Sequence, residues 1–141
     1  MITTLIAVDG SAHSLRAVQS VCKLAAAGLA MDIHVLNVQI PVESGHVRMF
    51  VAAELIEDYY REEGLQAMQA ACGALDAAGL RYTRHIAVGH VAETIAHYAD
   101  KLHVDQLFMG THGRGALTHI LLGSVASDVI ARVATVVSLV R

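Results

Sequence analysis

Three glycines and one serine, held at fixed spacing, are the residues of this chain best suited to bind a charged ligand. Gly110 ends a short apolar run, Gly113 follows it, and Gly123-Ser124 begins a helical pattern. Glycine allows positive φ and lets backbone N–H groups approach a ligand closely. Several such groups beside a helix N-terminus form a concavity that suits phosphate, and a serine hydroxyl can donate to it. The segment Gln106–Val125 is therefore predicted to hold the phosphates of a nucleotide.

Two common phosphate motifs do not account for these glycines. The P-loop reads GxxxxGK[ST], but the residue before Ser124 is a glycine rather than a lysine. The dinucleotide fingerprint GxGxxG belongs directly after the first strand, where this chain reads DGSAH from Asp9. The pattern that remains is G-x2-G-x9-G-S, beginning at Gly110.

Five short apolar segments alternate with helical patterns along the chain. The helical patterns have apolar residues three and four positions apart, and the first follows Ser11, a favoured N-cap residue. The second and longest pattern has Val51, Leu55 and Tyr59 early on its apolar stripe, and Gly64 marks a point where it could kink or break. The predicted strands are Thr3–Val8, Ile33–Ile40, Tyr82–Val88, Leu107–Met109 and Thr135–Val140.

This order of elements predicts an α/β fold. The strands are continuously apolar rather than alternating, which is typical of a parallel sheet with helices on both faces. No linker composition or second core is present, so one domain is expected over residues 1–141. Ligands of such open sheets bind beyond the carboxyl ends of the strands, near the point where the strand order reverses. Asp9 and Gly110 would both lie at that edge.

The glycine pattern resembles the signature of the universal stress protein family, in its ATP-binding branch. The match runs from Gly110 to Ser124 without a gap, and the similarity extends to the VDGS, LNV and VGHVAETI segments. The resemblance implies a five-stranded, doubly wound, flavodoxin-like sheet of order 3-2-1-4-5 that binds ATP, commonly as a homodimer. Such dimers often pair their last strands, here Val136–Val140. One departure is Ala134-Thr135, which replaces a common proline-containing entry to that strand.

The resemblance also assigns contacts with ATP by position. Asp9 and Val38 would contact the adenosine, Val38 through its backbone. Strand four would line the ribose and α-phosphate, and the glycine segment would hold the remaining phosphates, which in turn would hold Mg²⁺. The residues assigned in this way are Ala7, Asp9, Val38, Met109, Gly110, Gly113, Gly123, Ser124 and Val125.

Each of these residues also has a purely structural interpretation. Asp9 could cap the first helix, although Ser11 can already do so, and Ser124 could be a plain N-cap. The glycines could be turn formers. His112 would be a solvated loop residue or an auxiliary phosphate contact, and Arg114 either neutralises phosphate charge or is solvated. The nine histidines form no HxxxH, HExxH or Cys/His cluster, so no metal site is expected.

Catalysis is not the activity that the sequence favours. Phosphoryl transfer needs a positioned base, charge neutralisation and a bridging metal, yet the glycine segment has no lysine and Asp9 is the single carboxylate that can be placed nearby. Asp9, Ser11 and His13 fall within one turn, which does not suggest a triad. The favoured function is a nucleotide-dependent regulatory or stress-response protein. The alternatives are a slow ATPase or phosphotransferase using the same pocket, and a nucleotide-free dimeric adaptor.

Composition indicates which partners and which cellular compartment to expect for this chain. A net charge of −3 gives no footprint for nucleic acid. No apolar run approaches the roughly 18 residues of a membrane span, so a cytoplasmic protein without membrane contact is expected. Cys22 and Cys72 lie far apart in helical patterns and are interpreted as buried small residues rather than a disulfide. The segment Pro41–Met49 is predicted to be a mobile loop that either closes over the base or contacts a partner.

Overall fold

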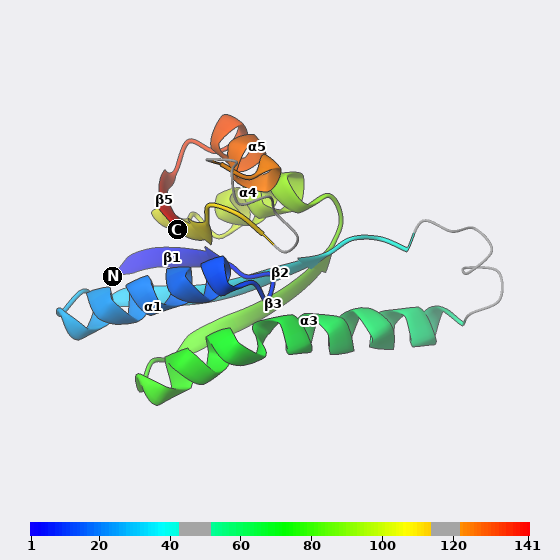
Figure 1. Cartoon of the computed structure of the whole chain (residues 1–141), viewed down its shortest axis with the longest axis horizontal. Helices are drawn as coiled ribbons and strands as arrows, with labels where there is room; N and C mark the ends of the chain where they lie inside the picture. Colours follow the sequence, from blue (N-terminus) through cyan, green and yellow to red (C-terminus); the bar gives the residue numbers. More distant parts are fainter. Residues whose placement is uncertain (43–51, 114–121) are drawn as a thin grey trace.

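The computed structural model describes residues 1–42, 52–113 and 122–141 of the chain. Within these residues, five parallel strands form one sheet in the order β3-β2-β1-β4-β5 (Figure 1). The predicted order 3-2-1-4-5 is confirmed. Val51, Arg114 and most of the predicted loop Pro41–Met49 lie outside the described residues. The elements are β1 Ile2–Ala7, α1 Ala12–Ala26, β2 Met31–Gln39, α3 Ala53–Ala77, β3 Tyr82–Val88, α4 Val91–Lys101, β4 Gln106–Gly110, α5 Ser124–Arg132 and β5 Val136–Val140.

Strand β1 lies at the centre of the sheet and decides where the site forms. It pairs with β2 on one side, Ala7 opposite Leu36, and with β4 on the other, Ile6 opposite Phe108. The chain order reverses across β1, because β2 and β3 extend to one side and β4 and β5 to the other. Since all strands are parallel, the carboxyl ends of β1, β2 and β4 meet at one edge, where ligands of such sheets bind.

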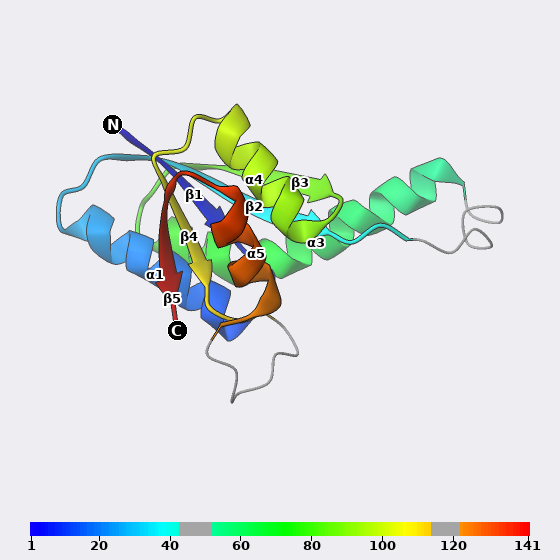
Figure 2. The same ribbon diagram turned by 90° about the horizontal axis from the view of Figure 1, so that it is seen from above.

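Helices cover both faces of the sheet, as predicted. Figures 1 and 2 show α1 and α3 on one face and α4 and α5 on the other. Neighbouring residues of a strand point to opposite faces, so Ile6 packs with α1 and α3, whereas Leu5 packs with α4 and α5. Both side chains are fully buried. Two apolar layers therefore sandwich the central strands, which explains their continuously apolar sequences.

Helix α3 differs from its prediction in two respects. It continues through Gly64 without a break, and a Cβ atom at this position would lie 2.8 Å from the Ile86 side chain. Gly64 thus lets α3 approach β3 closely. The early part of the predicted apolar stripe is exposed, Leu55 by 61% and Tyr59 by 51%, because this part of α3 extends beyond the sheet (Figure 2). No helix in the described ranges is both long and apolar enough to cross a lipid bilayer.

Candidate functional site

A cavity of about 450 Å³ opens at the carboxyl edge of the central strands. Every residue that the family resemblance assigned to the site lines it: Ala7, Asp9, Val38, Met109, Gly110, Gly113, Gly123, Ser124 and Val125. The structure therefore brings together four separate stretches of the chain, whereas contact with a nucleotide stays a prediction. Sequence reasoning missed further lining residues, which are Val8, Ser14, Leu36, Ile40, Val91, Ile95, Thr111 and Ala126.

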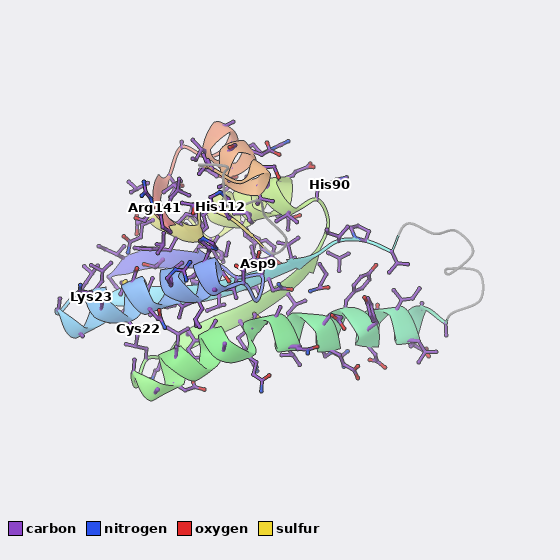
Figure 3. All side chains as sticks on the ribbon, viewed as in Figure 1. Asp9, Cys22, Lys23, His90, His112 and Arg141 are labelled. Carbon is purple, nitrogen blue, oxygen red and sulfur yellow. The ribbon has the colours of Figure 1, made fainter. Side chains whose placement is uncertain are left out.

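The turn after β1 places Asp9 at the cavity wall (Figure 3). Gly10 has a φ of +83°, a left-handed conformation that favours glycine. The Asp9 carboxylate accepts a hydrogen bond from the backbone N–H of Ser11 at 2.9 Å. Ser11 is itself the N-cap of α1, because its hydroxyl oxygen accepts from Ser14 N–H at 3.2 Å. Ser11, and not Asp9, therefore caps the helix, and Asp9 stabilises the turn beside the cavity.

The site glycines permit close packing rather than positive φ. A Cβ atom at Gly110 would lie 2.6 Å from the His13 Cβ and 2.9 Å from the His13 carbonyl carbon. At Gly113 it would lie 2.6 Å from Asp9 Oδ2, and at Gly123 2.9 Å from the Thr111 carbonyl oxygen. None of these three glycines has a φ in the left-handed region. The expectation of positive φ is therefore wrong for them, and the need for glycine comes from contacts with distant residues.

The start of α5 provides the helix N-terminus that the sequence predicted, but the backbone N–H of Gly123 is not one of its free donors. The backbone N–H of Gly123 donates to the Thr111 carbonyl at 2.7 Å, so it is already paired within the protein. Gly123 is also the N-cap and supplies no side chain to the first turn of α5. The first N–H groups of a helix have no intrahelical acceptor. Ser124 and Val125, which line the cavity, therefore present the positive end of the helix dipole to a ligand.

A buried amide fixes the opposite wall of the cavity. Asn37 lies inside β2 with 3% of its surface exposed, and its side chain donates to the Val8 carbonyl at 2.8 Å. Gln39 in turn donates to the Asn37 side-chain oxygen at 2.7 Å. The first bond ties β2 to the residue that follows β1, and the second joins the two neighbours of Val38 within β2. A polar residue within an apolar strand is the sequence signal that could have identified this contact.

Two histidines approach each other near the glycine segment. His112 lines the cavity, and its Nδ1 lies 3.0 Å from the Thr111 hydroxyl. The His13 ring, from α1, lies with its centroid 5.4 Å from that of His112. His112 therefore lies at the cavity, and its contact with phosphate stays a prediction. Asp9 is the one carboxylate among the described residues that line the cavity.

Comparison with known proteins identifies the family. The sequence matches the model of the universal stress protein family over residues 1–141. The chain belongs to this family. Universal stress protein MJ0531 of Methanocaldococcus jannaschii is 31% identical to it over 128 residues, which cover 89% of this chain and 74% of the relative.

Solved structures of similar proteins share the fold of this universal stress protein. The hypothetical protein MJ0577 is 28% identical, with a TM-score of 0.84 over 99% of this chain and 94% of the other. A universal stress protein in complex with cAMP is 27% identical, with a TM-score of 0.73 over 99% of this chain and 97% of the other. At least one similar protein therefore binds an adenine nucleotide.

Proposed function

We propose that this universal stress protein binds ATP in the cavity at the carboxyl edge of the sheet and acts as a nucleotide-dependent regulatory protein. The observation that carries the proposal is the shared lining of one cavity by Asp9 and by the three glycines and the serine that define the G-x2-G-x9-G-S signature. A volume of about 450 Å³ falls within the roughly 300–1,000 Å³ of small-molecule sites.

The two walls of the cavity differ in chemistry in the way that a nucleotide requires. The wall from the end of β2, the residue that follows it and the start of α4 is apolar, with Val38, Ile40 and Val91, and suits a planar base. The wall from the end of β4 and the start of α5 has glycines, the Ser124 hydroxyl and the α5 N-terminus, and it suits anionic phosphates. The similar protein in complex with cAMP supports an adenine nucleotide as the ligand class.

The groups at the site support binding more than phosphoryl transfer. Mg²⁺ in nucleotide sites is commonly held by one or two carboxylates and by the phosphates themselves. Asp9 is the one carboxylate in the described lining, so a Mg²⁺ ion would rely mainly on the phosphates. No lysine or arginine is present in that described lining. Binding by backbone N–H groups and the Ser124 hydroxyl is the chemistry that these residues can perform.

The first test is to denature the purified protein and chromatograph the nucleotide that it releases. Intact ATP would support the proposal, and ADP or AMP would favour the slow-hydrolase alternative. If no nucleotide is released and none binds on titration, the proposal is overturned and the nucleotide-free adaptor is favoured.

A matched pair of serine variants tests the phosphate end by calorimetry. Ser124→Ala removes a hydrogen bond to a charged group, worth about 1.5–3 kcal/mol, and should weaken ATP binding about 10- to 100-fold. Adenosine, which has no phosphates, should bind with equal affinity to the wild-type and the Ser124→Ala proteins. Ser127→Ala is the control, because Ser127 is exposed in the same helix and does not line the cavity. Equal ATP affinity of the Ser124→Ala and Ser127→Ala proteins would refute the phosphate role.

We also propose that the protein forms a homodimer through β5. This strand lies at the edge of the sheet, and Val136 at its start is 66% exposed. Unpaired edge strands present N–H and C=O groups to which a second strand can bind. Val136→Arg should convert the dimer to a monomer in light scattering, whereas Ile130→Arg, at an exposed position of α5, should leave it intact. A Val136→Arg protein that stays dimeric would refute this interface.

A further inference from the structure

Two histidines from neighbouring strands are hydrogen-bonded to each other, away from the nucleotide cavity. His34 lies on β2 and His85 on β3, where His85 pairs with Leu36. Alternate residues of a strand share a face, so both rings lie on the face of the sheet that α4 covers (Figure 2). His34 Nδ1 lies 2.9 Å from His85 Nε2, and the ring centroids are 5.1 Å apart. We call His34 and His85 the histidine pair.

The hydrogen bonds around the histidine pair determine which nitrogens carry protons. Asp32 Oδ2 lies 3.1 Å from His34 Nε2. An ionised carboxylate only accepts, so neutral His34 carries its proton on Nε2 and has a lone pair on Nδ1. His85 must then donate from its Nε2 to His34 when both rings are neutral.

One added proton can be held without the loss of either hydrogen bond. When it binds to His34 Nδ1, this nitrogen becomes the donor, and His85 accepts at Nε2 once it carries its own proton on Nδ1. His85 is half-buried, so solvent can exchange these protons. The His34 cation then lies between the Asp32 carboxylate and the His85 lone pair, and both stabilise it.

A second added proton cannot be held in this way. Both facing nitrogens would carry hydrogen, so the hydrogen bond would be lost, and two cations would lie side by side. Burial lowers the pKa of His85, and the charges of His34 and Lys101 lower it further. The folded chain therefore resists the second proton.

The elements packed against the histidine pair contribute both apolar and charged groups. On α4, the Tyr98 ring packs edge-on against His85 with the centroids 5.4 Å apart, and His97 packs on Tyr98. On β1, the residue opposite His34 is the apolar Leu5. Among the described residues, the charged or titratable groups around the pair are Asp32, His97, Tyr98 and Lys101.

We propose that the histidine pair is a pH-sensitive contact beneath α4, which is kept with no added proton or one and is broken by the second. Breaking it moves the His85 ring away from His34 and disturbs its packing on Tyr98. Helix α4 also lines the cavity through Val91 and Ile95, so acid should loosen one wall of the nucleotide site. This last consequence rests on the proposed function.

The first test is a pH titration of the protein with ¹⁵N-labelled histidine, because NMR then reports which ring nitrogen carries a proton. In the wild type, His85 should change from the Nε2 to the Nδ1 form as the pair takes up its first proton. The second step should follow more than about 1 pH unit lower. In the His34→Gln protein, His85 should titrate at higher pH than in the wild type, because the neighbouring charge is absent.

The control for this titration is His90→Gln, because His90 is exposed and its side chain makes no cap bond to α4. His85 should titrate in this protein as in the wild type. A wild-type His85 ring that keeps its proton on Nε2 until it is doubly protonated would overturn the proposal. This outcome can be read without any variant.

Urea unfolding at different pH values tests whether the second proton breaks the contact. An unfolded histidine titrates at a pKa of about 6.5, and folding lowers the pKa of His85. Its contribution to stability is therefore complete above about pH 6.5 and is lost as the pH falls below that value. In this range the folding equilibrium constant of the wild type should fall by up to about 10-fold per pH unit relative to His85→Gln. Glutamine can donate or accept but takes up no proton, and equal pH dependence of the two proteins would overturn the proposal.

Calorimetry of ATP binding to the same two proteins tests the effect on the nucleotide site. On acidification, the affinity of the wild type should fall by up to about 10-fold per pH unit relative to His85→Gln. Equal pH dependence of the two affinities would overturn the effect on the site. A protein that binds no ATP at any pH would contradict the proposed function, and the NMR titration would still decide whether the histidine pair responds to pH.

Discussion

Replacing Gly110 with alanine should destabilise the protein, because the end of β4 packs directly on the first turn of α1. The added Cβ would lie 2.6 Å from His13 Cβ, 2.9 Å from the His13 carbonyl carbon and 3.1 Å from Ser14 N. Two of these three atoms belong to the backbone of a helix, so rotation of a side chain cannot relieve the contact. Either α1 or the end of β4 has to move.

The size of the effect follows from this overlap. Ordinary van der Waals contact begins at 3.4 Å, which exceeds the distance to His13 Cβ by 0.8 Å. Overpacking of this kind typically costs about 1–3 kcal/mol. At about 3 °C of Tm per kcal/mol for a domain of this size, Gly110→Ala should lower the Tm by about 3–10 °C.

The matched control is the same substitution at Gly73. This residue lies inside α3, is exposed, and has no atom within 4 Å of an added Cβ. Alanine there should stabilise the helix by about 0.5–1 kcal/mol. Urea unfolding of both variants should therefore give changes of opposite sign. If Gly110→Ala unfolds at the wild-type urea concentration or above it, the packing of β4 on α1 is wrong.

Three further predictions concern the site and the edge of the sheet. Gly113→Ala would place a Cβ 2.6 Å from Asp9 Oδ2 alone. Because a carboxylate can rotate away, the Tm should fall by less than about 5 °C, whereas the affinity for ATP should fall about 10-fold or more. Unchanged ATP affinity in calorimetry would contradict the role of Asp9 in binding. Asn37→Ala removes the donor to the buried Val8 carbonyl and should cost about 1–3 kcal/mol in urea unfolding, so a neutral outcome would mean that this bond does not form. Burial and a hydrogen bond to a neighbouring carboxylate raise the pKa of Tyr82. The folded state therefore retains this proton when the unfolded chain loses it near a pKa of about 10, and stability should be constant below that pH and fall as the pH rises above it. The Tyr82→Phe protein should not lose stability in this alkaline range. If the free energy of unfolding depends on pH in the same way for both proteins, the pKa of Tyr82 is not raised by folding.

Much of the architecture could be predicted because it depends on local pattern. Continuous apolar strands alternating with helical periodicity require a covered parallel sheet, and the predicted strands agree with the observed ones to within one or two residues. Asp9 and the glycine segment meet for a related reason, since parallel strands place all their carboxyl ends at one edge. Family resemblance supplied the strand order, which periodicity alone does not specify.

Other features depend on residues that lie far apart in the sequence and meet only in the folded chain. The carboxylate of Asp9 leaves no room for a Cβ atom at Gly113, and the side chain of Ile86 leaves none at Gly64. Local rules for glycine, which concern φ and turns, indicate neither contact, and they allowed a break at Gly64 that α3 does not have. The pairing of His34 with His85 follows from the register of β2 with β3, and one residue of slip would place one ring on the opposite face. The sequence by itself determined the elements and the edge where they meet, whereas tertiary packing decided which atoms face each other, because those distances depend on register and helix approach.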